Sequence, residues 1–172
     1  MQRIYSYGYL LAAACRATER SLLAETNAED TLIENMNAVL LCALTLEAFL
    51  NHIGEQIIPC WAPLKRKLSP KKKLEVIAAH KSINLKWAEA PLQSFTAVME
   101  FRNLIAHAET EDVEPKSGEL SDIPQAKWQL FCTPISTKRI YKDTRSIVEN
   151  YPSMLGIATI PPFLLSERLQ DQ

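Results

Sequence analysis

The chain contains unusually little glycine, with 4 glycines among its 172 residues, whereas glycine makes up about 7% of an average protein. Gly8, Gly54, Gly118 and Gly156 lie far apart in the sequence. The chain therefore lacks the glycine-rich loops that bind dinucleotides or nucleoside triphosphates. Because many hairpin turns need glycine, the shortage also favours helices over β-hairpins.

Several further absences exclude classes of chemistry and location. The three histidines and four cysteines have no spacing typical of a zinc site or a redox motif, so we expect no metal, no cofactor and reduced, buried cysteines. No segment reaches the roughly 18 uninterrupted apolar residues of a membrane span, and the N-terminus makes a poor signal peptide. We therefore expect a cytoplasmic protein without membrane contact. A formal net charge of -1 excludes a surface that is basic throughout.

Apolar residues recur at three- and four-residue steps along most of the chain, which predicts helices. Residues 110–121 read as an acidic loop, and 128–131 as a short strand or a packed extended piece. The sequence thus predicts an all-α, up-and-down bundle of four to five helices in residues 1–150, with an irregular crossing before the last helix. Residues 151–172 are expected to form an irregular tail that docks on the bundle. The expected helices cover residues 3 to about 25, 31–58 (ended by Pro59 and Pro63), a third from the N-cap Ser69 and Pro70, about 91–109, and about 136–150.

Two charged residues interrupt the apolar faces of two predicted helices. Glu47 lies between Leu46 and Leu50 in the second helix, and Arg102 lies in the apolar stripe of the fourth. Because an unpaired charge is costly to bury, we predict that Glu47 and Arg102 meet across the helix pair. Asn51 lies one turn after Glu47. A pair that only fixes the register of the two helices remains the alternative interpretation.

The fourth helix ends in the string Arg102-Asn103-Leu104-Ile105-Ala106-His107. Asn103 and His107 are four residues apart, which places them on one helix face. Arg102 and His107 differ by five positions, or roughly 140° around the helix axis and about 7.5 Å along it. The string resembles the RNxxxH form of the Rx4-6H motif of the HEPN superfamily (higher eukaryotes and prokaryotes nucleotide-binding). The resemblance extends over about residues 1–150, but only these six residues are specific.

The resemblance implies a helical bundle that commonly dimerises and, in many members, cleaves RNA without a metal. By this resemblance Arg102 would stabilise the phosphate or the transition state, and His107 would be the general acid and base. Asn103 would orient His107 or the ribose, with Glu47 and Asn51 in support. Attack by an internal 2′-hydroxyl needs a proton acceptor and a fixed cation, which histidine and arginine supply.

A basic run offers a second candidate site. Three lysines follow Ser69 and Pro70 directly, although the N-terminus of a helix favours anions. An RNA backbone would account for this pattern, and a solvated surface turn is the plainer alternative. The candidate RNA-binding residues are Lys65, Arg66, Lys67, Lys71, Lys72 and Lys73.

Two functions follow from these residues. The first is a metal-independent endoribonuclease that resembles HEPN ribonuclease toxins, acting as a homodimer in a toxin or defence system. An antitoxin or a nucleotidyltransferase would be a possible protein partner. The alternative is a non-catalytic, HEPN-like dimeric module that binds RNA, a nucleotide or another protein.

Overall fold

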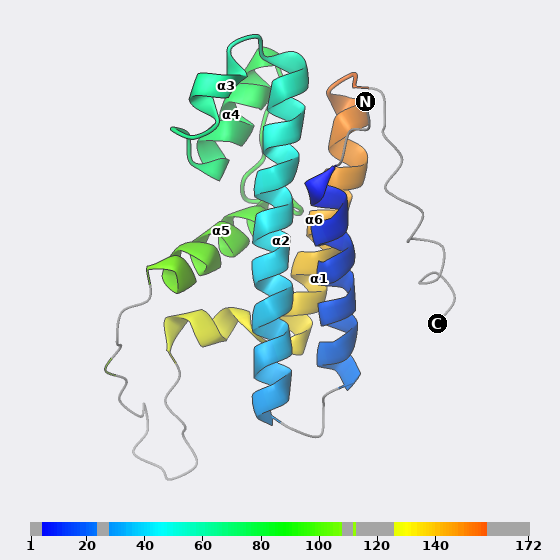
Figure 1. Ribbon diagram of the computed structural model, residues 1–172, viewed down its shortest axis with the longest axis vertical. Coiled ribbons are helices and arrows are strands. Elements are labelled where there is room, and N and C mark those ends of the chain that lie inside the picture. Colours follow the sequence, from blue (N-terminus) through cyan, green and yellow to red (C-terminus); the bar gives the residue numbers. More distant parts are fainter. Residues whose placement is uncertain (1–4, 24–27, 108–111, 113–125, 158–172) are drawn as a thin grey trace.

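The computed structural model describes residues 5–23, 28–107, 112 and 126–157. These residues form six α-helices, one 3-10 helix and no strand (Figure 1), so the predicted all-α class is confirmed. The elements are α1 (Ser6–Leu23), α2 (Ala28–Ile57), α3 (Trp61–Leu64), α4 (Pro70–His80), α5 (Leu92–Ala106), η1 (Lys127–Phe131) and α6 (Pro134–Met154).

The 30-residue helix α2 is the centre of the bundle, and it contacts every other element. Helices α1 and α6 pack along it, with α1 running against the direction of α2 and α6 (Figure 1). Helix α5 crosses α2 obliquely, and α3 and α4 lie at the end of the molecule where α2 ends. Phe49 and Leu50 of α2, Phe95 and Phe101 of α5 and Ile147 of α6 belong to one core cluster.

By length and composition alone, α2 is long and apolar enough to cross a membrane. The central helix of a globular bundle meets the same criterion, and half of the relevant window of α2 is buried against the rest of the chain.

The turn after α2 is fixed by close packing. Helix α2 ends at Ile57, before Pro59, as its sequence predicts, and Trp61–Leu64 form the single turn α3 after a gap of three residues. The side chain of Trp61 is buried there against Gly54. A Cβ atom on Gly54 would collide with the indole ring of Trp61, so this approach depends on glycine at position 54.

Several boundaries differ from the prediction. Helix α2 begins at Ala28, three residues before the predicted start. Helix α5 ends at Ala106, three residues before the predicted end. Residues 127–131 form η1 rather than a strand, because they pack as a compact turn between α5 and α2. Helix α6 begins after its N-cap Thr133 and continues to Met154, which its last-turn Pro152 does not prevent. Most of the predicted acidic loop and residues 158–172 of the predicted tail lie outside the described residues.

Candidate functional site

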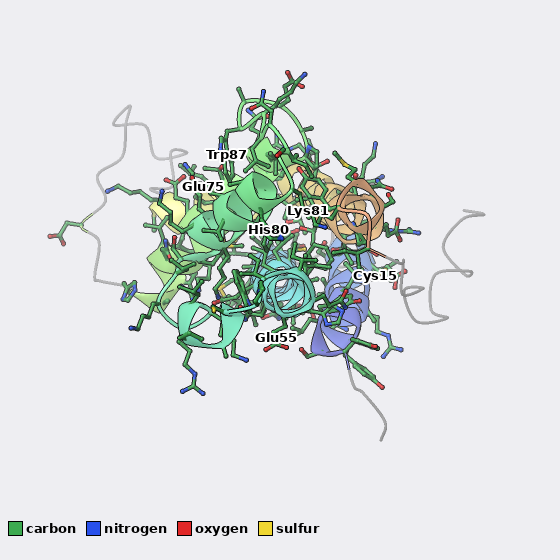
Figure 2. All side chains as sticks on the ribbon, turned by 90° about the horizontal axis from the view of Figure 1, so that it is seen from above. Cys15, Glu55, Glu75, His80, Lys81 and Trp87 are labelled. Atoms are coloured by element: carbon green, nitrogen blue, oxygen red, sulfur yellow. The ribbon has the colours of Figure 1, made fainter. Side chains whose placement is uncertain are left out.

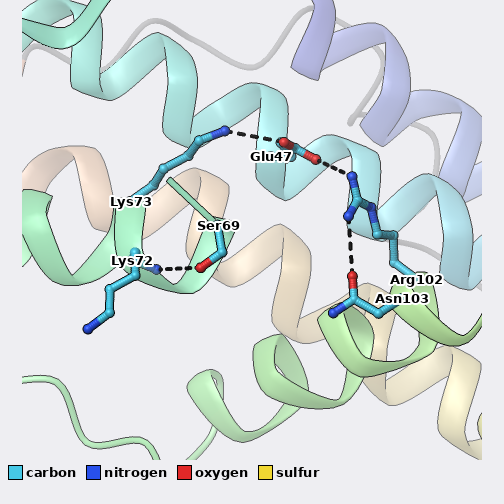
Figure 3. Close-up of polar contacts among 6 residues, drawn as sticks. All are labelled: Glu47, Ser69, Lys72, Lys73, Arg102 and Asn103. Carbon is cyan, nitrogen blue, oxygen red and sulfur yellow. Dashed lines mark hydrogen bonds and ion pairs between the residues drawn. The ribbon is translucent and has the colours of Figure 1, made fainter. Parts of the chain in front are cut away.

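Glu47 and Arg102 meet between α2 and α5, as the sequence predicts. The Nη2 atom of Arg102 lies 3.4 Å from Oε2 of Glu47 (Figure 3). The two side chains are 34% and 28% exposed, so the pair is half-buried at the edge of the core. The guanidinium therefore keeps a face toward the solvent.

Glu47 has a second cationic partner, the ammonium group of Lys73 on α4. The Nζ atom of Lys73 lies 3.2 Å from Oε1 of Glu47, and only 1% of the lysine side chain is exposed (Figure 3). Lys73 is buried because it shares the inward face of α4 with Leu74 and Ile77. This position corrects the expectation that Lys73 lies on the surface with the other RNA-binding candidates.

The three charged groups form a cluster with a net charge of +1. One carboxylate lies between two cations, and each of its oxygens contacts one of them. Arg102 also donates from Nη1 to Oδ1 of Asn103, at 3.2 Å. These two contacts use two of the five N–H groups of a guanidinium, so the exposed side of Arg102 has the charge and the donors for an anion.

His107 caps the C-terminus of α5 and is exposed. Its backbone N–H donates to the carbonyl oxygen of Asn103, at 3.0 Å. No described residue forms a hydrogen bond or an ion pair with the imidazole, and the Asn103 amide is bound to Arg102 instead. Arg102, Asn103 and His107 thus lie on the last turn and a half of one helix, and none of the described residues orients the imidazole.

Asn51 lies one turn beyond Glu47 on α2 and is half-buried. Its Oδ1 atom is buried and has no hydrogen-bond partner among the described residues. Asn51 therefore takes no visible part in holding Arg102, which is the task that Glu47 performs.

The rest of the basic run lies on the surface around α3 and α4. Lys65 pairs with Glu55 at 2.5 Å, and Lys72 pairs with Glu75 at 2.7 Å. The ammonium of Lys71 lies over the ring of Trp87, 4.8 Å from its centre. Glu75 and His80 belong to α4, and in the view from above Lys81 and Trp87 lie beside this helix (Figure 2). Arg66 and Lys67 are exposed, as are Lys71 and Lys72.

Ser69 caps the N-terminus of α4, as predicted. Its hydroxyl oxygen accepts a hydrogen bond from the backbone N–H of Lys72, at 3.4 Å, and Pro70 occupies the first turn (Figure 3). The cap and the nearby acidic partner of Lys72 help α4 to begin despite three successive lysines.

The cysteines do not form a reactive centre. All four are free, and Cys42 and Cys132 are buried, whereas Cys15 is half-buried and Cys60 is exposed, so the expected burial is wrong for these two. Burial raises the pKa of both thiols to about 12, so neither is ionised at neutral pH. Within the described ranges, no three His, Cys, Asp or Glu side chains are grouped to hold a metal ion.

Two buried polar contacts in the structure were not predicted from the sequence. One is the Lys73–Glu47 pair, whose only signal was the helical phase that Lys73 shares with Ile77. The other joins α5 to α6, where the Ser94 hydroxyl donates to Oδ2 of Asp143 at 2.5 Å. Neither residue of this second pair stood out, because serine and aspartate are common in exposed positions of helices.

Comparisons with known proteins give no relative for this site. No family model, no curated protein and no solved structure matches the chain. The function is therefore argued from the geometry of the chain itself.

Proposed function

We propose that this protein is a metal-independent endoribonuclease, resembling the HEPN toxins, that works in the cytoplasm as a toxin or defence component. One observation carries the proposal. The Arg102 guanidinium is held at the surface between Glu47 and Asn103, and an exposed histidine caps the same helix five residues later. A fixed cation and a proton acceptor on one helix end are two of the groups that RNA cleavage by internal attack requires.

In this mechanism His107 accepts the proton of a ribose 2′-hydroxyl. The 2′-oxygen forms a bond to phosphorus, and the bond from phosphorus to the 5′-oxygen breaks. Arg102 stabilises the negative charge of the phosphorane between these two events. The products are a 2′,3′-cyclic phosphate and a 5′-hydroxyl, and the departing oxygen needs a proton from an acid.

The acid would come from a second copy of the chain. The motif contains one histidine, and a two-fold homodimer would bring a second His107 to the site. Such a contact would also supply a partner for the imidazole, which has none among the described residues. The candidates for binding the RNA backbone are the surface residues Lys65, Arg66, Lys67, Lys71 and Lys72. An antitoxin or a nucleotidyltransferase remains a proposed protein partner.

The alternative function is a non-catalytic dimeric module that binds RNA, a nucleotide or a protein. It is favoured by the engagement of Arg102 in an ion pair between helices, which gives that residue a structural task. The two functions differ in one measurable property, which is the cleavage of RNA.

The test is cleavage of single-stranded and structured RNA by the purified protein in EDTA. We expect products with 2′,3′-cyclic phosphate or 3′-phosphate ends. His107→Ala should lower the rate by roughly 10²–10⁴-fold and leave the melting temperature unchanged, because the side chain is exposed. His80→Ala is the matched control, since His80 is also exposed in the last turn of a helix, and it should retain the full rate.

Further results would decide between the two functions. Arg102→Lys with an unchanged melt should also lose cleavage, because an ammonium cannot replace a planar guanidinium. Light scattering should give a dimer mass. Activity that requires Mg²⁺ or survives His107→Ala would indicate a contaminating nuclease, and RNA binding without cleavage would support the binding module.

A further inference from the structure

Lys73 is a buried cation with no assigned role in the proposed reaction. Its side chain is 1% exposed, so it cannot itself touch a phosphate at the surface. Yet its ammonium lies 3.2 Å from the carboxylate that holds Arg102. A buried charge is costly to keep, and a buried ion pair is often no more stabilising than apolar residues of the same volume. Stability alone therefore does not explain why a lysine is buried at position 73.

The charge balance of the cluster formed by Glu47, Lys73 and Arg102 explains the buried lysine. Without Lys73, Glu47 would face Arg102 alone, and the pair would have no net charge. With Lys73, the carboxylate is shared between two cations, and the cluster keeps a charge of +1. Because Lys73 is enclosed in the core and Arg102 is 34% exposed, the surplus charge is accessible to a ligand only through the guanidinium.

We propose that Lys73 is a positioning residue that keeps Arg102 competent to bind a phosphate group. It does so by engaging one oxygen of Glu47, so that the carboxylate orients the guanidinium without neutralising it. The ligand class is a phosphodiester or another phosphate anion at the exposed side of Arg102. The inference rests on the proposed function for the identity of its biological ligand, an RNA backbone phosphate.

The experiment measures anion binding at Arg102 without requiring catalysis. The probe is inorganic pyrophosphate, which has no ribose hydroxyl and cannot undergo the proposed cleavage. The readout is the Nε–Hε resonance of Arg102 in a ¹H–¹⁵N spectrum, assigned by its loss in Arg102→Lys. This resonance reports binding at the site itself, even when pyrophosphate also contacts the lysines near α4.

Lys73→Met should weaken pyrophosphate binding at Arg102 by about tenfold, because methionine fills a similar volume without the charge. Glu47→Gln combined with Lys73→Met should restore the affinity to within a few-fold of wild type, because Arg102 is then again the single unbalanced charge. Lys86→Met removes a lysine from a surface Lys–Glu pair and should leave the resonance and the affinity unchanged.

If Lys73 has only a structural role, we expect a different pattern. Lys73→Met would then melt at a lower temperature, but the folded variant would bind pyrophosphate with the wild-type affinity. That result would overturn the inference, as would a folded double variant that binds as weakly as Lys73→Met. If Lys73→Met does not fold, the double variant against wild type decides, and a tenfold loss there contradicts the proposal.

The outcome is separable from the proposed function. A chain that binds pyrophosphate through Arg102 as described but cleaves no RNA would keep the role of Lys73 and refute the ribonuclease. A chain that cleaves RNA through His107 but binds pyrophosphate equally well after Lys73→Met would support the ribonuclease and refute the role of Lys73.

Discussion

Glu47 forms ion pairs with cations from two different helices, and the two pairs differ in burial. Arg102 is one-third exposed, so water can solvate its charge when the carboxylate is removed. Lys73 is enclosed, and its ammonium would lose the only anion within bonding distance among the described residues. The stability of the cluster therefore depends more on Glu47 than on Arg102.

We expect Glu47→Ala to lower the free energy of unfolding by about 3–5 kcal/mol, since it leaves a buried charge unpaired. Arg102→Ala should cost about 1 kcal/mol or less, as for a partly exposed pair. Urea unfolding followed by circular dichroism measures both values. Equal losses for the two variants would contradict this assignment of burial.

A double-mutant cycle of Glu47→Gln and Lys73→Met provides the control for that prediction. Removing both partners should cost less than the sum of the two single losses, because neither charge is then left alone. Additive losses would show that the two side chains do not interact.

Part of this site could be predicted from the sequence. Glu47 and Arg102 each interrupt an apolar face, and opposite charges in that position most simply pair with each other. Lys73 follows two other lysines, and only its helical phase separates it from them. Which face of α4 turns inward depends on its packing against α2, and that is a tertiary property that a lone basic run does not reveal.

At the scale of elements, the end of α2 depends on one glycine. The ring of Trp61 lies against Gly54, so the turn through α3 can return close to the helix that precedes it. This approach directs the chain toward α4, and hence positions Lys73 beside Glu47. A larger residue at position 54 would push α3 away from α2.

Gly54→Ala should therefore destabilise the protein by about 1–3 kcal/mol, because overpacking exceeds the gain in helix propensity. Gly8→Ala is the matched control, since an added Cβ there meets no atom within 4 Å. It should be neutral or stabilise α1 by up to about 1 kcal/mol. Thermal unfolding of the two variants measures the difference, and a stable Gly54→Ala would refute the close approach.

The long elements were predictable and the short ones were not. The periodicity of α2 and the Ser69–Pro70 start of α4 are local signals, and both are confirmed within a few residues. Helices α3 and η1 have four and five residues, too few for a periodic pattern to show. Their conformation follows from packing against α2 and α5.

At the scale of the whole molecule, the buried thiols link folding to alkaline pH. Burial raises the pKa of Cys42 and Cys132 from 9.0 to about 12, and burial also raises the pKa of Tyr141. Between pH 9 and 12 the unfolded chain releases protons that the folded chain retains. The contribution of the two buried, neutral thiols to the free energy of unfolding is complete below pH 9 and is lost as the pH rises toward 12.

We expect each of the two thiols to lower stability by about 2 kcal/mol when the pH rises from about 8 to about 10.5. Urea unfolding under reducing conditions across this range measures the slope. Replacing Cys42 and Cys132 by alanine should flatten it, whereas Cys60→Ala, at an exposed position, should not. An unchanged slope in the double variant would assign the effect to the tyrosines.

The shared carboxylate of Glu47 also constrains how this protein can evolve. In a related protein that has lost only Lys73, Glu47 would neutralise Arg102. In one that has lost only Glu47, the buried ammonium of Lys73 would be unpaired. Losing both charges together avoids both penalties and leaves Arg102 cationic. Positions 47 and 73 should consequently form an epistatic pair and covary in diverging lineages, with the arginine at position 102 retained throughout.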